Sequence, residues 1–210
     1  MESLAVQRVA VVLFEGFTVL DVYGPVQAFA LAGTPTGDGR YHRYFEVVTV
    51  AATAGPVRSN EGPTTIADYA FEDLPQPDIL LIPGGLGTRV AVDDSTFVDT
   101  VRKASVRANL TTTVCTGSAL LARTGLLDGR PATSNKMAWD WVTSLGSNVL
   151  WRRQARWVDD GNLVSSSGIS AGIDMALAVI SRIHGRETAE RAARAMEYVW
   201  NDSPDHDPFA

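Results

Sequence analysis

The stretch of sequence that decides the fold is "TTTVCTGSALLARTG", residues 111–125. A β-branched run gives way to small residues and then to a leucine-rich segment. This order predicts a buried strand over 110–115, a sharp turn, and a short helix over 118–125. Cys115, the only cysteine in the chain, stands at the turn. Such a strand, turn and helix are typical of a nucleophile elbow, although a buried structural cysteine would fit the same position.

Strands and helices alternate on both sides of this stretch. Apolar runs predict strands and apolar residues at helical spacing predict helices. The expected strands are residues 8–14, 44–53, 78–85 and 110–115 and a hairpin over 155–167, with a loop over 33–40; the expected helices are residues 18–33, 93–108, 118–125, 137–146, 170–185 and 186–200. Alternation of this kind predicts an α/β fold, doubly wound, with a mostly parallel sheet and helices on both faces.

No repeat or linker divides the sequence. We therefore expect a single domain over residues 1–210, with its core at about 8–200. The last ten residues, "NDSPDHDPFA", are polar and contain proline, so we expect them to be loose or draped over a neighbour.

Composition limits the class of protein and of partner. The chain has 210 residues, 45% of them hydrophobic, and a formal net charge of −6. This charge argues against nucleic acid or an anionic membrane as the main partner. The first residues lack the pattern of a signal peptide, and no apolar stretch reaches the roughly 20 residues of a membrane helix. A lone cysteine cannot form an internal disulfide, so we expect a cytoplasmic protein.

Two further segments lie just after predicted strands. "IPGG" (82–85) ends one strand, and Asp21 follows the first strand in "VLDVYGP". Ligands bind at this edge of an open α/β sheet, so both segments are expected near Cys115. The two glycines are suited to present backbone N–H groups, as an oxyanion hole requires. Asp21 is either the N-cap of the next helix or a general acid/base; Glu15 is the competing carboxylate but is expected to be solvated.

The expected chemistry is a cysteine paired with a carboxylate. His42, His184 and His206 are far in sequence from these segments and too scattered for a histidine-based metal site. The helix that follows the turn is expected to lower the pKa of Cys115. Because a thiolate and a carboxylate in contact would repel, Asp21 is expected to share one proton with the sulfur and to have a raised pKa.

Four segments together resemble the ThiJ/PfpI superfamily, and within it the isonitrile (isocyanide) hydratases. They are "VVLFEGFTVLDVYGP", "DILLIPGGLGTR", "VCTGSALLARTGLLDGRPATS" and "SGISAGIDMALAVI". The resemblance runs from residue 8 to about 200. It implies a flavodoxin-like fold related to class I glutamine amidotransferases, and a homodimer. It also implies a hydro-lyase that converts an isonitrile to an N-substituted formamide through a thioimidate, without a cofactor or a metal.

The resemblance also implies roles for individual residues. Cys115 would be the nucleophile, Asp21 the general acid/base and Thr116 the elbow neighbour. Substrate or intermediate would be bound by Gly84, Gly85, Gly117 and Ile169. Two segments differ from the hydratase pattern: Ser134-Asn135-Lys136 stands where many relatives carry Thr-His, and Ser165-Ser166-Ser167 precedes Gly168 where the hydratases tend to be glycine-rich.

Three other functions stay open at the level of sequence. One is a cofactor-free glyoxalase, although such members usually pair a Glu and a His with the cysteine. Another is a ligand-sensing module, as in regulators that carry a similar domain fused to a helix-turn-helix region. The third is a redox sensor in which Cys115 is oxidised to a sulfinate. A small-molecule substrate remains the leading expectation.

Overall fold

A seven-stranded sheet lies at the centre of the computed structural model, which describes residues 5–210. The strand order is β12-β13-β9-β8-β1-β4-β7, and every pair is parallel except β12 with β13. The strands are β1 (Gln7–Val12), β4 (Phe45–Ala51), β7 (Tyr69–Ala70), β8 (Ile79–Ile82), β9 (Leu110–Thr113), β12 (Trp157–Asp160) and β13 (Leu163–Ser166). The expected doubly wound, mostly parallel, flavodoxin-like sheet is confirmed.

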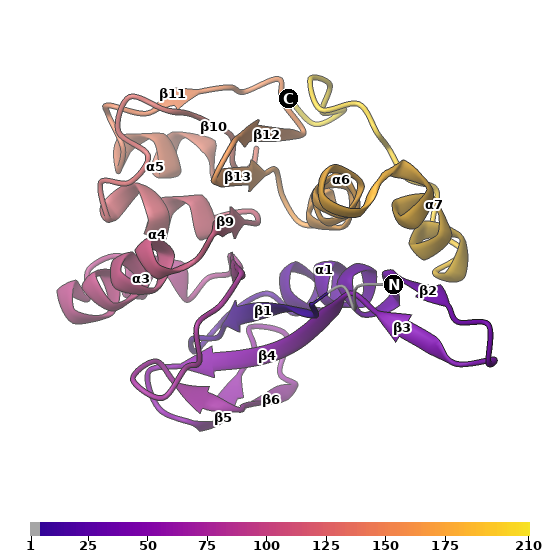
Figure 1. Ribbon diagram of the computed structural model, residues 1–210. Helices are drawn as coiled ribbons and strands as arrows, with labels where there is room; N and C mark the ends of the chain where they lie inside the picture. The colour runs from indigo at the N-terminus through magenta and orange to yellow at the C-terminus, as the bar shows by residue number, and fades with distance from the viewer. Residues whose placement is uncertain (1–4) are drawn as a thin grey trace.

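Helices cover both faces of the sheet (Figure 1). They are α1 (Val19–Leu31), α2 (Thr88–Ala91), α3 (Ser95–Arg107), α4 (Gly117–Arg123), α5 (Trp139–Ser144), α6 (Ala171–His184) and α7 (Arg186–Ala195). Helices α1, α6 and α7 pack together on one side, while α4 contacts α2, α3 and α5 on the other (Figure 1). Asp94 caps α3 by accepting from the N–H groups of Thr96 and Phe97, each at 3.0 Å, which explains the start of that helix.

Three small two-stranded sheets accompany the central one. They pair β2 (Gly33–Pro35) with β3 (Tyr41–Arg43), β5 (Gly55–Arg58) with β6 (Thr64–Ala67), and β10 (Pro131–Ala132) with β11 (Leu150–Trp151). The segment 33–40, expected to be a loop, thus begins with a strand. Strands β2 and β3 are only three residues long and do not alternate buried apolar with exposed polar residues, so the sequence pattern does not reveal them.

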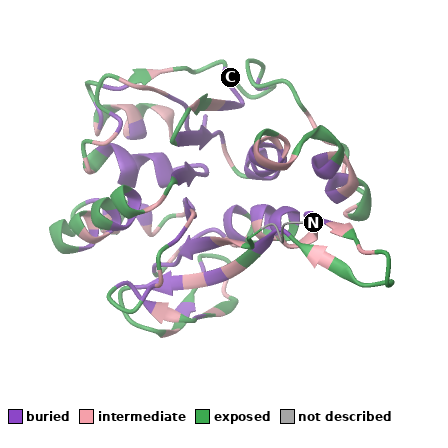
Figure 2. Ribbon diagram, in the orientation of Figure 1, coloured by how far each residue is buried: buried purple, intermediate pink, exposed green. Residues whose placement is uncertain are grey.

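Burial concentrates in the middle of the sheet and in the helix faces against it (Figure 2). All four residues of β8 and all four of β9 are buried. Three of those in β9 are threonines, and Thr112 satisfies its hydroxyl by donating to the Leu80 carbonyl at 3.3 Å. A strand buried on both faces therefore carries polar side chains next to the turn that holds Cys115.

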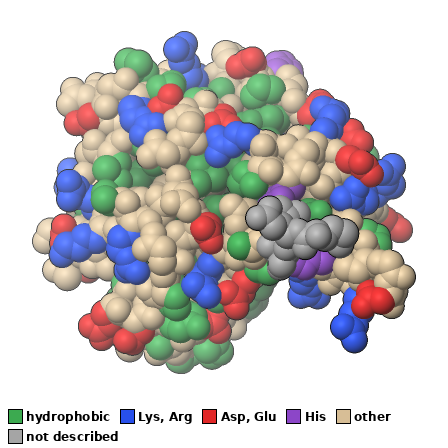
Figure 3. Space-filling view, in the orientation of Figure 1, with side chains coloured by type: hydrophobic (Ala, Val, Ile, Leu, Met, Phe, Trp, Pro, Cys, Tyr) green, Lys and Arg blue, Asp and Glu red, His purple; other side chains and the backbone are tan. Residues whose placement is uncertain are grey.

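The outer surface mixes charges of both signs. Figure 3 shows Lys and Arg side chains interspersed with Asp and Glu on the face in view. On α7, Arg191 pairs with Glu187 at 2.8 Å and Arg186 pairs with Glu190 at 2.8 Å, both at i,i+4 spacing. No helix within residues 5–210 is long and apolar enough to cross a membrane.

The C-terminal segment is hydrogen-bonded to the body of the protein. The Arg156 N–H donates to the Pro204 carbonyl at 2.7 Å, and the Asp207 N–H donates to the Gln154 carbonyl at 2.8 Å. Asp207 is buried and lies 3.9 Å from the buried ammonium of Lys136. A segment expected to be loose or draped over a neighbour is thus attached beside β12, through contacts that its polar sequence does not indicate.

A buried ion pair between Arg156 and Asp174 lies next to the start of this segment. The Arg156 guanidinium holds Asp174 Oδ2 at 2.5 and 2.7 Å. Oδ1 of the same carboxylate accepts from the Tyr198 hydroxyl at 3.1 Å and from the Asn201 N–H at 3.0 Å. Every oxygen of Asp174 is therefore occupied, although the residue is fully buried.

We expect Asp174→Ala to lower the free energy of unfolding by about 3–5 kcal/mol, because it leaves the Arg156 charge buried and unpaired. The matched control is Asp159→Ala, which breaks the half-exposed pair with Arg182 and should cost about 1 kcal/mol or less. Urea unfolding at neutral pH measures both. Equal losses in the two variants would contradict a stabilising role specific to the buried pair.

Candidate active site

Cys115 occupies the turn between β9 and α4. Its φ of 58° lies in the left-handed region, which costs a non-glycine residue about 1–3 kcal/mol. Its N–H donates to the carbonyls of Ser166 (3.2 Å) and Ser167 (3.1 Å). The hydroxyls of Ser118 (3.2 Å) and Ser134 (3.0 Å) donate to its carbonyl. The backbone is held in a strained turn of the kind that presents a nucleophile.

Asp21 lies in the first turn of α1 and is fully buried. Its Oδ2 accepts a hydrogen bond from the Gly84 N–H at 2.9 Å. Its Oδ1 has no hydrogen-bond partner among residues 5–210. The N-cap of α1 is Thr18, so the interpretation of Asp21 as an N-cap is wrong. A buried carboxylate with one unpartnered oxygen is poorly solvated, and this favours the protonated form of the carboxyl.

Burial dominates the pKa values of both Asp21 and Cys115. It raises the pKa of Asp21 to about 7, against the lowering effects of the Gly84 N–H and of the nearby Cys115 side chain. This agrees with the expected raised value. Burial also raises the pKa of the Cys115 thiol, and the negative charge of Asp21 raises it further. At neutral pH the sulfur therefore holds a proton, and Asp21 is the neighbouring group that can accept it.

The direction for Cys115 is opposite to the lowering expected from the helix N-terminus. Helix α4 has only seven residues, and Cys115 is only 5% exposed. The Thr116 N–H and the Asn135 side chain form hydrogen bonds that favour the thiolate, but they do not outweigh burial in the pKa of the resting thiol. The cost of removing the thiolate charge from water is the largest effect, and it makes the pKa shift of Cys115 upward.

The two glycines after β8 position side chains of the site. A Cβ on Gly84 would lie 2.5 Å from the Thr116 nitrogen and 2.9 Å from Asp21 Oδ2, so only glycine permits this close approach. The Gly85 N–H donates to the Thr116 hydroxyl at 3.0 Å, and Thr88 also meets that hydroxyl at 3.1 Å. Both glycine N–H groups, expected to bind an intermediate, are thus engaged with Asp21 and Thr116.

The other two expected binding residues, Gly117 and Ile169, lie in different segments of the chain. The Gly117 N–H donates to the Val114 carbonyl at 2.9 Å, which closes the turn. Ile169 immediately precedes the N-cap of α6 and is 41% exposed. It follows Gly168, whose surroundings include the Asn135 amide. The structure thus brings one expected binding residue into the turn and leaves the other at an exposed edge.

Asn135 is a site residue that sequence reasoning did not assign. Its side-chain amide donates to Cys115 Sγ at 3.2 Å, across a separation of 20 residues. The only signal in the sequence is the departure at Ser134-Asn135-Lys136 from the hydratase pattern, which marks the segment without indicating a contact. Ser134 has a second unassigned contact, through its hydroxyl to the Cys115 carbonyl.

In the part of the chain that the structure describes, Cys115 has neither a histidine partner nor a metal-binding cluster beside it. Within residues 5–210, no hydrogen bond joins a histidine to Cys115 or Asp21; His184 instead bonds Gln7 at 2.9 Å and stacks on Tyr44. The same residues contain no group of three or more His, Cys, Asp or Glu side chains that could hold a metal ion.

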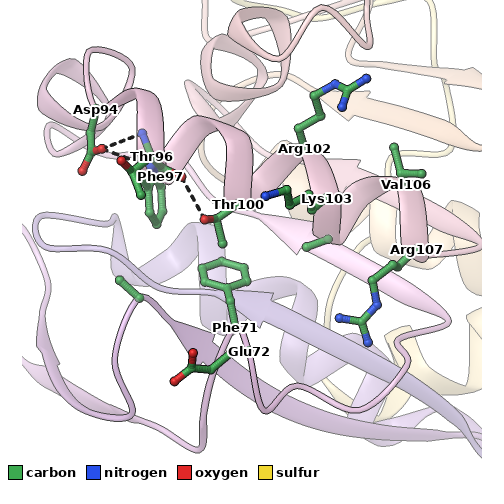
Figure 4. A pocket seen from close by; sticks show the side chains of 12 residues that line it. Phe71, Glu72, Asp94, Thr96, Phe97, Thr100, Arg102, Lys103, Val106 and Arg107 are labelled. Carbon is green, nitrogen blue, oxygen red and sulfur yellow. Dashed lines mark hydrogen bonds between the residues drawn. The ribbon is translucent and has the colours of Figure 1, made fainter.

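A separate cavity of about 820 Å³ lies between α3 and the segment after β7 (Figure 4). Phe71 and Phe97 meet edge to face in its wall, with ring centroids 6.0 Å apart. Two of its polar side chains have local partners: Asp94 caps α3, and the Arg107 guanidinium donates to the Leu74 carbonyl at 3.0 Å. This cavity does not include Cys115 or Asp21, so the candidate site is defined by the strand ends and not by this cavity.

Comparisons with known proteins find relatives over most of the chain. Residues 7–182 match the DJ-1/PfpI family. The isonitrile hydratase of Pseudomonas putida is 33% identical, over 97% of this chain and 86% of the hydratase. The HTH-type transcriptional regulator CdhR of Pseudomonas aeruginosa is 30% identical over 84% of this chain, which spans only 51% of the regulator. A crystal structure of a ThiJ/PfpI family protein from Pseudomonas syringae superposes with a TM-score of 0.80 at 29% identity, over 98% of this chain and 78% of that one.

Proposed function

The chain belongs to the DJ-1/PfpI family, and from that premise we propose that it is an enzyme that hydrates an isonitrile to an N-substituted formamide. Cys115 is the nucleophile and Asp21 is the general acid/base. The observation that carries the proposal is the fully buried carboxyl of Asp21, which interacts with the only thiol of the chain and has a pKa of about 7. A carboxyl with this pKa can both take and give a proton near neutral pH.

The first step forms a carbon–sulfur bond. Asp21 takes the proton of the Cys115 thiol, and the sulfur lone pair attacks the terminal carbon of the isonitrile. Negative charge develops on that carbon, and the protonated Asp21 returns its proton there. The products of the step are an S-linked thioimidate and the Asp21 carboxylate. No metal or electron carrier takes part in this balance.

The second step adds water and releases the enzyme. Asp21 accepts a proton from water as the oxygen attacks the thioimidate carbon, and it passes that proton to the nitrogen. The tetrahedral carbon then expels sulfur as the carbon–oxygen double bond forms. The hydroxyl proton released in this collapse passes through Asp21 to the Cys115 sulfur, and the sum of the two steps is one isonitrile and one water converted to one formamide.

The attack step needs no oxyanion hole, because its charge develops on a carbon that Asp21 protonates. The engagement of the Gly84 and Gly85 N–H groups with protein partners is compatible with this chemistry.

The test is turnover by the purified protein. We expect cyclohexyl isocyanide to be converted to N-cyclohexylformamide, followed by proton NMR or by mass spectrometry, with a blank that lacks protein. Methylglyoxal is the parallel substrate. Conversion of methylglyoxal without any formamide would overturn the proposal in favour of a glyoxalase. Failure on several isonitriles of different size, by folded protein with a free thiol, would overturn it in favour of a sensing role.

A further inference from the structure

We propose that Asn135 is a third catalytic residue of this site, whose side-chain amide donates a hydrogen bond to the Cys115 sulfur and stabilises it as a thiolate. As a role in turnover, this rests on the proposed function of Cys115 and Asp21; as a contact with the sulfur, it can be tested without a substrate. The donor nitrogen lies 3.2 Å from Sγ. A hydrogen bond to a charged acceptor is worth more than one to a neutral acceptor, so the contact strengthens as the proton leaves sulfur.

The orientation of the amide is fixed by a second contact. Asn135 Oδ1 accepts from the Ala138 N–H at 2.8 Å, at the residue that caps α5. An N–H can donate only to the oxygen of the amide, so the NH₂ group must face away from Ala138 and toward the sulfur. The first turn of α5 therefore selects the one amide orientation that gives Cys115 a donor.

A glycine on a different segment makes room for the amide. A Cβ on Gly168 would lie 2.0 Å from the Asn135 nitrogen and 3.0 Å from its side-chain carbon. Any side chain at position 168 would push the amide away from the sulfur. The segment between β13 and α6, which also binds the Cys115 N–H through the Ser167 carbonyl, thus sets the place of this donor.

The Asn135 amide is also a neutral donor, so it stabilises the sulfur without taking part in proton transfer. An amide does not take up or lose a proton near neutral pH, so Asn135 can hold the sulfur without competing for its proton. The nearest cation in sequence, Lys136, is occupied elsewhere: its ammonium donates to Thr133 Oγ1 at 2.7 Å and to the Ala155 carbonyl at 2.8 Å. Proton transfer at the sulfur is left to Asp21.

The experiment measures alkylation of the thiol by iodoacetamide across pH 6 to 10. Because Cys115 is the only cysteine, the second-order rate constant reports one sulfur. We expect Asn135→Ala to lower this constant about 10- to 100-fold near neutral pH, the range given by a hydrogen bond to a charged group. Asn135→Asp keeps an acceptor for the Ala138 N–H but replaces the donor with an oxygen, and it should react more slowly still.

Two further variants connect the effect to geometry. Gly168→Ala should lower the rate constant like Asn135→Ala, and the double variant should be no slower than Asn135→Ala alone, since both changes remove the same contact. Asn148→Ala, an exposed asparagine that bonds Asp128 at 3.4 Å, is the matched control and should react like the wild type. Thermal melting verifies that each variant is folded.

Wild-type rates in folded Asn135→Ala and Asn135→Asp would overturn the proposal. If Asn135→Ala does not fold, Asn135→Asp and Gly168→Ala decide it on the same readout. The isonitrile assay is run on the same samples. If the variants are alkylated more slowly than the wild type but the wild type turns over no isonitrile, the Asn135 contact is supported and only the hydratase function is overturned. If the wild type turns over isonitrile but the variants are alkylated at the wild-type rate, the hydratase function is supported and the role of Asn135 is overturned.

Discussion

Replacing Cys115 by alanine is expected to abolish isonitrile turnover, with a loss of at least about 10³-fold in kcat, because no other group forms the carbon–sulfur bond. Cys115 is the only thiol of the chain, so no second cysteine can substitute for it. The variant should fold, because alanine has the same energetic cost as cysteine at this left-handed φ. The hydrogen bonds at Cys115 that hold the turn are also made by its backbone.

Two controls accompany this variant. Cys115→Ser keeps the size of the side chain and tests nucleophilicity alone, since a hydroxyl of much higher pKa attacks poorly. Pretreatment of the wild type with iodoacetamide should remove activity in parallel with the modification of one sulfur. More than about a tenth of wild-type turnover in folded Cys115→Ala would contradict covalent catalysis by this residue.

Asp21→Asn is expected to reduce kcat by about 10²- to 10⁴-fold, the range for loss of a general acid/base. Asparagine still accepts the Gly84 N–H through its oxygen, so the side chain remains in place while proton transfer is lost. The matched control is Glu61→Gln: Glu61 is a carboxylate near Asp21 that accepts from the Val19 N–H at 3.0 Å, and its loss should leave turnover largely intact.

The same variant has an opposite effect on stability. The pKa of Asp21 rises from 3.8 to about 7 on folding, so the folded state prefers the protonated acid. Its stabilising contribution is present at low pH and is lost as pH rises through about 7, by linkage. Asparagine does not ionise. We therefore expect the stability of Asp21→Asn relative to the wild type to increase by about 2–3 kcal/mol between pH 5 and pH 8.

Urea unfolding of the two proteins at both pH values measures this difference. An advantage of Asp21→Asn that does not grow with pH would contradict a raised pKa for Asp21. The combined result, slower turnover with higher stability at pH 8, is characteristic of a site whose buried charge costs folding free energy and serves chemistry.

Much of the fold follows from the sequence because its signals are local. The apolar runs and the helical spacing predict six of the seven strands of the central sheet and six of the seven helices to within a few residues; the two-residue strand β7 and the four-residue helix α2 are too short to show a pattern. The exceptions have local reasons as well. Helix α7 ends at Ala195 and not at residue 200. Glu197, two residues after this end, takes a left-handed φ of 50°. Neither the apolar spacing nor a glycine marks the end of the helix in the sequence.

The site is only partly visible in the sequence. Cys115 and Asp21 can be found because each is an unusual residue at a strand end. The Asn135 contact cannot, because it depends on where a loop 20 residues further along returns to the sheet. The direction of the Cys115 pKa depends on how far water is excluded, and the partners of the Gly84 and Gly85 N–H groups depend on side-chain placement. None of these three features can be predicted from the spacing of residue types along the sequence.

The most direct test of the central claim is the mass of the protein during turnover. The enzyme is mixed with excess cyclohexyl isocyanide, quenched with acid within a turnover, and digested for peptide mass spectrometry. The covalent mechanism predicts a peptide containing Cys115 that is heavier by the mass of one isonitrile, and no such adduct in Cys115→Ala. Formamide production at full rate by enzyme already alkylated at Cys115, with no adduct in the quenched samples, would contradict it.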